Sequence, residues 1–536
     1  MNYSVRYLRS TATSCASRLV ALLALVLAAC ATSPPGADYP RDASRALANP
    51  EQTKLGALTA KWSAQHGGLS GFRLLPGGID SFSLRMEMAD AATRTIDAQY
   101  FILKGDDTGR LFIGRLLAAA DRGVRVRLLL DDANSVGGDR RVTALAAHKN
   151  IEVRMFNPFR IGGGFQPFRA VDLALEAPRV SRRMHNKLLA IDNAIAVAGG
   201  RNIGDEYFKG NRAFEFGDLD IFVAGPDVRR LERSFDAYWN SDLSIPAQAL
   251  DKIDDAALES YRKELDEHQA KMADSDYERH TREGDPLKTI IDGTKPLVYA
   301  RAQVMYDSPD KAKPDAEDEF DAAHVMKRLE EACRATQREL IVVTPYLVPG
   351  ASQMAMLREL RSRNVRVRIL TNSLASTDVP LVHAGYRKRR LPLVEMGVEL
   401  FEVKPELDAP QVGRMRLVSD PDGRFSLHAK VFVFDRERVF VGSANFDMRS
   451  AHLNTEIGII IDSPELAQQA VNRFEAITIA ANSYAVKLAT SLGEPTVHWI
   501  TEQDGKRVEL DHEPGGEFWR ELLVGAVSIL PIDDQL

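Results

Sequence analysis

Short apolar runs alternate along this chain with longer stretches in which apolar residues recur at helical spacing. The runs at 95–100, 124–130 and 188–191 are short, strand-favouring and bounded by polar or turn-forming positions. Runs of this kind predict largely buried strands, and the periodic stretches between them predict helices. The alternation therefore predicts an α/β fold in which helices flank a buried sheet.

The same pattern occurs a second time. Residues 340–346 and 365–370 repeat the runs 95–100 and 124–130 in order, and 365–370 (VRVRIL) nearly copies 124–130 (VRVRLLL). Internal similarity at so long a period predicts two homologous domains. We expect each domain to hold a mixed β-sheet flanked by helices. We also expect a pseudo-two-fold to relate the domains around one shared active site.

Composition marks the segments outside the two repeats. Residues 249–300 are dense in charge and poor in apolar positions, which predicts a solvated helical linker or insertion. Near the end, Asp504-Gly505 predicts a hairpin turn. The apolar run at 518–530 predicts a helix that lies on a membrane surface or packs on the domain. The expected segments are a signal peptide at 1–29, a tether at 30–70, domains at 71–248 and 301–485 joined by 249–300, and a tail at 486–536.

The first thirty residues have the pattern of a targeting segment. Arg6, Arg9 and Arg18 precede an apolar run at 19–29 that is short for a membrane-spanning helix. The run ends in Leu-Ala-Ala-Cys, which resembles a bacterial lipoprotein cleavage box with Cys30 as the lipidated residue. The alternative is an uncleaved signal anchor with an incidental cysteine.

Lipidation at Cys30 would tether the protein to a membrane facing the periplasm of a Gram-negative bacterium. Ala31 in place of an aspartate after the cysteine favours the outer membrane over the inner one. After processing, Cys333 is the one remaining thiol, which excludes an intrachain disulfide or a thiolate zinc site. The formal net charge of −6 lacks the basic footprint of a nucleic-acid-binding protein, so we expect no nucleic-acid partner.

A short polar signature occurs once in each repeat. It reads His-x-Lys, then Asp five residues after the Lys, then Gly-[Gly/Ser]-x-Asn. Every keyed position of the second copy lies 243 residues after its partner, as 428 does after 185. The copies are His185, Lys187, Asp192, Gly200 and Asn202 in the first repeat, and His428, Lys430, Asp435, Ser443 and Asn445 in the second.

Two such sites facing one cleft supply what cleavage of a phosphodiester needs. Lys187 and Lys430 would neutralise the phosphate oxygens, and Asn202 and Asn445 would donate to the same oxygens. One histidine would attack phosphorus while the other protonates the departing alcohol. Because imidazole titrates near neutral pH, one neutral and one protonated histidine are expected together.

Further polar residues support this site. Asp218 and Glu456 are each expected to accept a hydrogen bond from Nδ1 of the histidine in their own repeat. Asp192 and Asp435, at the far ends of the strands, are interpreted as turn residues. The small residues before the asparagines let the backbone approach a phosphate closely, and there Gly200 lacks the hydroxyl that Ser443 provides.

The doubled pattern resembles the phospholipase D superfamily, and the wider sequence resembles its bacterial cardiolipin synthase C type. Residues 183–187, 199–208, 218–220, 371–374 and 518–532 carry this likeness. The resemblance implies an enzyme without metal or other cofactor that moves a phosphatidyl group between alcohols through a phosphohistidine. It further implies His185 as the nucleophile and His428 as the general acid and base.

The leading hypothesis is therefore a phosphatidyltransferase that makes cardiolipin from phosphatidylglycerol and a second phospholipid. A phospholipase D that hydrolyses phospholipids to phosphatidic acid would use the same residues. An endonuclease of the same superfamily is disfavoured by the acidic charge, and a silent binding protein by the intact histidines and lysines. The sequence leaves the donor lipid, the acceptor and any helper protein open.

Overall fold

The computed structural model describes residues 33–132, 140–160, 176–208, 214–275, 278–279, 284–314, 324–407, 411–412, 415–416, 424–491 and 493–515. The expected signal peptide with Cys30 and the expected helix at 518–530 lie outside these residues. Within them, no helix combines the length and the apolar character needed to cross a membrane.

The first half of the chain forms a mixed sheet. Its strands lie in the order β9-β4-β3-β2-β5-β6-β8-β1, with β2, β3 and β4 parallel and the other neighbours antiparallel. The strands are β1 (Ser70–Leu75), β2 (Thr95–Tyr100), β3 (Arg125–Asp131), β4 (Ile151–Phe156), β5 (Leu188–Ile191), β6 (Ile195–Gly199), β8 (Asp220–Ala224) and β9 (Ser244–Pro246).

The second half repeats this arrangement. Strands β14-β13-β11-β18-β19-β21 follow the order and directions of β4-β3-β2-β5-β6-β8, and three antiparallel strands, β22 to β24, extend the sheet beyond β14. The strands are β11 (Glu339–Val343), β13 (Arg366–Asn372), β14 (Glu399–Val403), β18 (Val431–Phe434), β19 (Arg438–Gly442), β21 (Ile457–Asp462), β22 (Ser483–Ser491), β23 (Glu494–Gln503) and β24 (Lys506–Leu510). The predicted α/β class and the internal duplication are confirmed.

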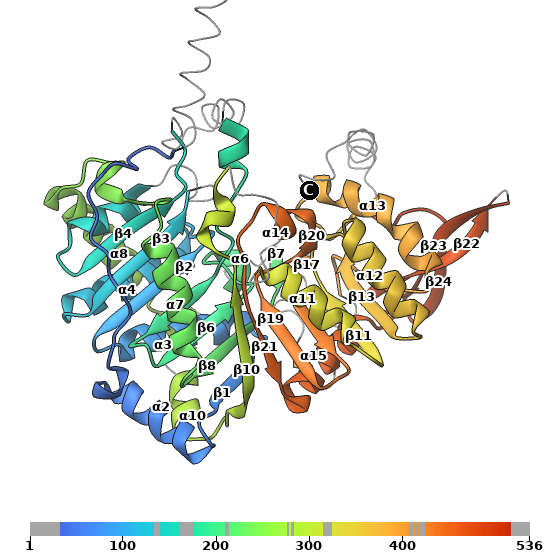
Figure 1. The fold of residues 1–536 in the computed structure, drawn as a ribbon, viewed down its shortest axis with the longest axis horizontal. Coiled ribbons are helices and arrows are strands. Elements are labelled where there is room, and N and C mark those ends of the chain that lie inside the picture. The colour runs from blue at the N-terminus through green and yellow to red at the C-terminus, as the bar shows by residue number, and fades with distance from the viewer. Residues whose placement is uncertain are drawn as a thin grey trace, which may run out of the picture.

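Strand β10 (Val298–Tyr306) joins the two halves. Its first residues, 298–300, pair antiparallel with β1, and residues 301–306 pair antiparallel with β21. In the described part of the chain, the two repeats therefore form one continuous sheet of 18 strands. Figure 1 shows the halves side by side with β10 between them.

Alternate side chains of each strand serve two different cores, as extended backbone requires. In β5, Leu189 and Ile191 pack with α3 and α4, while Leu188 and Ala190 face a core shared by both halves. That shared core also holds α7 and α15, so the two halves bury apolar surface together. The helices on the separate cores are α3 (Gly78–Ala91) and α4 (Asp107–Asp121) in the first half, and α11 (Val325–Arg334) and α12 (Ala351–Ser362) in the second; α7 is Val228–Trp239 and α15 is Pro464–Ile477.

The charged segment 249–300 is more than a solvated linker. Its helix α8 (Asp255–Met272) buries Leu258, Tyr261 and Leu265 in the core of the first half, and α10 (Pro286–Ile291) adds Leu287 and Ile290. The few apolar residues of each helix recur at helical spacing, so they lie on one face, and that face is buried. The segment therefore packs as part of the first half before the chain enters β10.

The hairpin expected near the C-terminus is present. Strands β23 and β24 pair around Asp504 and Gly505, both with positive φ (51° and 72°), as a tight type I′ turn requires. The expected boundary at 485–486 falls inside β22, which pairs with β14 and so continues the sheet of the second half. The remaining elements are η1 (Pro50–Gln52), α2 (Lys54–Gln65), η3 (Arg140–Ala147), α6 (Asp205–Phe208), β7 (Phe214–Gly217), η4 (Ala247–Ala249), η5 (Pro309–Ala312), β12 (Leu347–Val348), α13 (Pro380–Glu395), β15 (Gln411–Val412), β16 (Met415–Arg416), β17 (Arg424–Leu427), β20 (Phe446–Asp447) and α14 (Met448–His452).

Candidate active site

The two His-x-Lys segments lie at the junction of the halves, immediately before matching strands. Strand β5 begins just after Lys187, and β18 begins just after Lys430. His185 and His428 are only 6% and 5% exposed. Each imidazole also contacts aromatic rings: Phe101 lies edge-on to His185, and Tyr207 and Phe216 lie against His428.

The backbone of each histidine is bound to the opposite half. The amide of His185 donates to the carbonyl of Thr455, and the amide of His428 donates to the carbonyl of Gly217. Strand β17, which leads into His428, pairs in parallel with β7 of the first half. Each histidine therefore lies beside the residue that precedes the other half's carboxylate.

The carboxylates cross between the halves in the same way. Nδ1 of His185 donates to Glu456 at 2.9 Å, and Nδ1 of His428 donates to Asp218 at 2.6 Å. Asp218 and Glu456 are 0% exposed. The expectation that each carboxylate binds the histidine of its own repeat is wrong. The reason is that the segment before each histidine pairs in parallel with a segment of the opposite half. This pairing brings each histidine next to the carboxylate of that half.

Each carboxylate is nevertheless held in place by its own half. A Cβ on Gly200 would lie 2.2 Å from Oδ1 of Asp218, so only glycine leaves room for this carboxylate. In the second half, the hydroxyls of Ser443 and Ser450 donate to Glu456. The glycine and serine that distinguish the two copies thus match a short and a long carboxylate.

The lysines complete a compact cationic site. Nζ of Lys187 donates to the carbonyl of His185, and Nζ of Lys430 lies 3.2 Å from Nε2 of His428. Both lysines are buried, at 1% and 0% exposure. The charge of Lys430 acts on His185 and that of Lys187 acts on His428, so the four side chains share one electrostatic environment.

Burial sets the protonation of the site. Desolvation lowers the pKa of His185 to about 4, opposed by Glu456 and assisted by Lys187. Desolvation and Lys430 lower the pKa of His428 to about 3, although Asp218 opposes them. Both imidazoles are therefore neutral at pH 7 in this structure, whereas one neutral and one protonated ring were expected. Ionised carboxylates can only accept, so each holds a proton on Nδ1 and leaves the Nε2 lone pair as the reactive one.

The lysines and carboxylates are shifted by the same burial. Desolvation lowers the pKa of Lys430 to about 8 and that of Lys187 well below its usual range. Burial alone would raise the pKa of Asp218 and Glu456, but the imidazole hydrogen-bonded to each and the charge of the nearby lysine lower both pKa values. The carboxylates are thus ionised at pH 7.

The two asparagines differ in their contacts. Asn202 donates from Nδ2 to the hydroxyl of Tyr207 at 2.9 Å and accepts from the amide of Ile102. Oδ1 of Asn445 is buried and has no hydrogen-bond partner among the residues described. Asn445 is therefore the less committed of the two predicted donors.

Asp192 and Asp435 occupy turns away from the histidines. Both have positive φ (52° and 55°) and lie between paired antiparallel strands. The carboxylate of Asp192 accepts from the amides of Thr93, Arg94 and Thr95. Asp435 accepts from the amides of 337–339 in the matching way. These residues bind each hairpin turn to the start of the neighbouring antiparallel strand, β2 or β11.

Sequence reasoning missed the second layer around the histidines. Phe101, Tyr207 and Phe216 exclude water from the imidazoles, and Ser450 binds the carboxylate of Glu456. No periodic signal marks these residues, although Tyr207 and Phe208 follow the first signature within a few positions. Among the described residues, no group of three or more His, Cys, Asp or Glu side chains is arranged to hold a metal ion.

Comparison with known proteins agrees with this geometry. Residues 86–239 and 329–478 match the model of the family described as "Cardiolipin synthase, PLD-like domain". The chain is 36% identical to cardiolipin synthase C of Escherichia coli, over 90% of this chain and 99% of that protein. It is 32% identical to an uncharacterized protein of Helicobacter pylori, over 78% and 82% of the two chains.

One solved structure shares the overall fold. The phosphatidylserine synthase of Haemophilus influenzae aligns over 89% of this chain and all of that chain, with a TM-score of 0.53 and 11% identity. At this identity the likeness concerns the arrangement of the two halves alone. It supports the predicted two-domain architecture.

Proposed function

The chain belongs to the cardiolipin synthase, phospholipase D-like domain family, and we propose that it makes cardiolipin from phosphatidylglycerol and a second phospholipid. It is a phospholipid phosphatidyltransferase in this proposal, with His185, His428 and the two lysines as catalytic residues. The observation that carries the proposal is the pair of crossed dyads, His185–Glu456 and His428–Asp218, within one lysine-containing site.

The first step would transfer the phosphatidyl group to the enzyme. The lone pair on Nε2 of His185 attacks phosphorus, a P–N bond forms, and the P–O bond to the departing alcohol breaks. The proton on Nε2 of a protonated His428 passes to that alcohol oxygen. Lys187 and Lys430 stabilise the charge on the non-bridging oxygens in the transition state.

The second step would reverse these roles. A hydroxyl of phosphatidylglycerol gives its proton to Nε2 of His428, and its oxygen attacks the phosphohistidine. The new P–O bond forms as the P–N bond breaks, which frees His185. Glu456 and Asp218 hold the two rings in the required tautomer throughout, because each accepts the proton-bearing Nδ1.

Binding of the substrate would raise the pKa of His428, which must carry a proton to act as the acid. A phosphodiester brings one negative charge into a site from which water is largely excluded, and a nearby opposite charge raises the pKa of an imidazole. His428 would therefore bind a proton when substrate is bound, while His185 stays neutral through contact with phosphorus. His428 would therefore stay neutral until a substrate with a leaving group is bound.

A product assay with labelled lipid tests the proposal. The full chain is incubated with vesicles of phosphatidylglycerol carrying deuterated acyl chains and unlabelled phosphatidylethanolamine, and the lipids are resolved by mass. Cardiolipin with one labelled diacylglycerol unit would identify phosphatidylethanolamine as the donor, and cardiolipin with two would identify phosphatidylglycerol. Phosphatidic acid alone would instead assign hydrolysis, and an unchanged lipid profile would refute both. His185→Ala serves as the control for contaminating activity.

Membrane attachment is proposed to occur through lipid on Cys30, with the catalytic halves on the periplasmic side and the outer membrane as the favoured location. The support is the sequence Leu-Ala-Ala-Cys after the apolar run at 19–29, together with a membrane lipid as substrate. Cys30→Ser should abolish incorporation of labelled palmitate and release the protein from washed membranes. Retention of the variant in membranes, without label in the wild type, would favour the signal-anchor alternative.

A further inference from the structure

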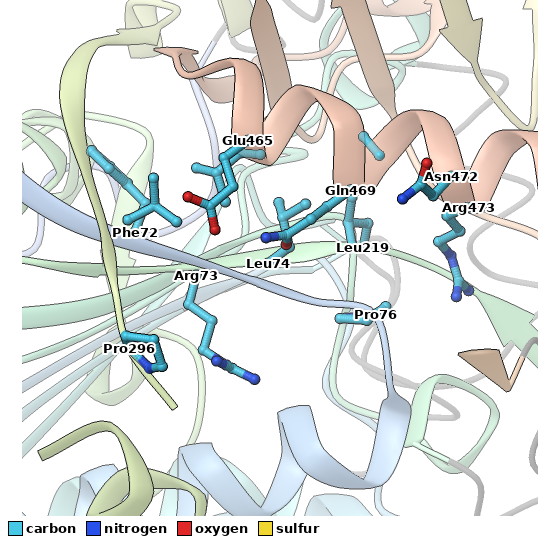
Figure 2. A pocket seen from close by; sticks show the side chains of 13 residues that line it. Phe72, Arg73, Leu74, Pro76, Leu219, Pro296, Glu465, Gln469, Asn472 and Arg473 are labelled. Atoms are coloured by element: carbon cyan, nitrogen blue, oxygen red, sulfur yellow. The ribbon is translucent and has the colours of Figure 1, made fainter. Parts of the chain in front are cut away.

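A cavity of about 380 Å³ lies at the junction of the halves and does not include either histidine. It is bounded by β1 of the first half, by residues 296–298 leading into β10, and by α15 of the second half. Figure 2 shows helix α15 on one side and strand β1 on the other. The volume lies within the range of about 300–1,000 Å³ that is typical of small-molecule sites.

The most informative residue of this cavity is Arg473. It is only 9% exposed, and its guanidinium has no hydrogen bond or ion pair within 4 Å among the described residues, although the charges of Glu215 and Asp218 act on it. Figure 2 shows its side chain extending from α15 toward the level of Pro76. Burial and the charge of Arg201 lower the pKa of Arg473 to about 10, so it is still a cation at pH 7. A buried cation without a directly hydrogen-bonded anion is costly, and an anion bound beside it would be stabilised.

The matching position of the first half has no such charge. Arg127 stacks on Phe235 and pairs with Asp236, and Arg368 stacks on Phe474 and lies 3.6 Å from Glu475 in the same way. These contacts align Phe235 with Phe474. The residue before each phenylalanine is therefore Ser234 in the first half, fully buried, and Arg473 in the second. The repeat alone does not require an arginine at this place.

The cavity is amphipathic. Phe72, Leu74 and Leu466 give it apolar walls, while Arg73 supplies a second cation. Arg73 is partly buried, and the charge of Asp80 acts on it. Glu465 also lines the cavity, and Figure 2 shows its carboxylate on the side of Arg73, away from Arg473. The Arg473 end thus favours an anion next to apolar surface.

A second, small void lies between this cavity and the segment that carries His428. This void of about 20 Å³ shares Leu219, Ala470 and Arg473 with the cavity and is otherwise lined by apolar residues that include Leu427 and Ala429. In extended backbone these neighbours of His428 project to the opposite face from the imidazole. The charge of Arg473 also acts on Asp218, the carboxylate partner of His428.

We propose that this cavity is a second lipid site, which binds one anionic phospholipid with its phosphate on Arg473 and acyl chain against Phe72, Leu74 and Leu466. The choice of phosphatidylglycerol as probe rests on the proposed function, but the recognition of an anionic amphiphile does not. A phosphate offers two or more oxygens to the planar guanidinium, and the acyl chain removes apolar wall from water. Free phosphate shares the first interaction and lacks the second.

The test counts lipids on the intact chain. His185→Ala prevents turnover, and native mass spectrometry measures binding of dihexanoyl phosphatidylglycerol at rising concentration. Two bound lipids are expected, one at the histidines and one at Arg473. Adding Arg473→Ser introduces the residue found at the matching position 234 of the first half. This variant should bind one lipid fewer, or bind the second lipid at least tenfold more weakly. Arg229→Gln on the surface of α7 removes the same charge elsewhere and should leave two.

Three further measurements test the roles of the phosphate and the acyl chain and locate the bound lipid. Gln469→Trp narrows the cavity at an exposed position without touching Arg473, and it should also remove one lipid. Inorganic phosphate at the same concentration should not displace the second lipid. A phosphatidylglycerol with a diazirine in its acyl chain should label peptides from 70–76 or 464–477. Thermal unfolding of each variant confirms that it is folded.

The outcomes distinguish this proposal from the proposed function. Two lipids of unchanged affinity on both Arg473→Ser and Gln469→Trp would refute the second site, whatever the wild-type chain produces. Displacement by phosphate alone at equal concentration would refute the lipid occupant. A wild-type chain that makes no cardiolipin but still loses one lipid through Arg473→Ser would overturn the proposed function and leave this site in place.

Discussion

The pairing of each histidine with the carboxylate of the opposite half predicts that two carboxylate substitutions slow different steps of the reaction. Glu456→Gln removes the charge that Nδ1 of His185 meets at 2.9 Å, and Asp218→Asn removes the one that His428 meets at 2.6 Å. A buried hydrogen bond to a charged group contributes about 1.5–3 kcal/mol, which corresponds to a loss of roughly 10- to 150-fold in the step it supports. If His185 is the nucleophile, Glu456→Gln slows formation of the phosphoenzyme by this factor.

A phosphatidyl substrate with p-nitrophenol as leaving group separates the two steps. This alcohol leaves without a proton, so the first step needs His185 but not the acid His428. With Asp218→Asn, rapid mixing should therefore show a near-normal burst of p-nitrophenolate followed by slow turnover. With Glu456→Gln, the burst itself should slow by about 10- to 150-fold. Glu437→Gln, at an exposed surface carboxylate, should change neither phase.

The reverse result would refute the reasoning. Loss of the burst in Asp218→Asn, with a normal burst in Glu456→Gln, would mean either that each carboxylate serves its own repeat or that His428 is the nucleophile. Acid-labile phosphate label distinguishes these cases. Label on His185 in the wild type would leave the carboxylate pairing at fault, and label on His428 would leave the assignment of the nucleophile at fault.

Three further results are expected. Because burial lowers the pKa of Lys430 to about 8 and its charge is lost as pH rises through that value, kcat/KM should fall above pH 8; a flat profile to pH 9.5 would contradict this. Gly200→Ala places a Cβ 2.2 Å from Asp218 and should lower turnover far more than Ser443→Ala, which removes one hydroxyl and should cost about tenfold; equal losses measured by kcat would disprove the steric argument. Asp192→Ala leaves three backbone amides without their acceptor and should lower the free energy of unfolding in denaturant by about 2–4 kcal/mol, with kcat unchanged in the folded fraction.

The sequence predicted most of the framework because local pattern and duplication carry it. The strands at 95–100 and 188–191 lie where the apolar runs placed them. The position of each histidine immediately before a buried strand followed from the same runs. The paired motif also predicted that Asp192 and Asp435 are turn residues, since both follow directly on those strands.

The crossing of the dyads was beyond sequence reasoning because symmetry hides it. A repeat aligns Asp218 with Glu456 and His185 with His428, but it does not tell which member of one pair meets which of the other. The short parallel pairings decide this: β7 with β17, each four residues long, and the single bridge between Met184 and Thr455. The protonation of the imidazoles was missed for a related reason: burial of each ring depends on Phe101, Tyr207 and Phe216, which lie outside the repeated signature.

Strand β10 has a consequence for how substrates enter and leave. It is hydrogen-bonded to β1 along one part of its length and to β21 along the rest, so it ties the two halves edge to edge. Opening the molecule like a clamshell would break both ladders and expose the apolar core beneath them. We therefore expect the first alcohol to leave and the second to enter through the same opening, without separation of the two halves.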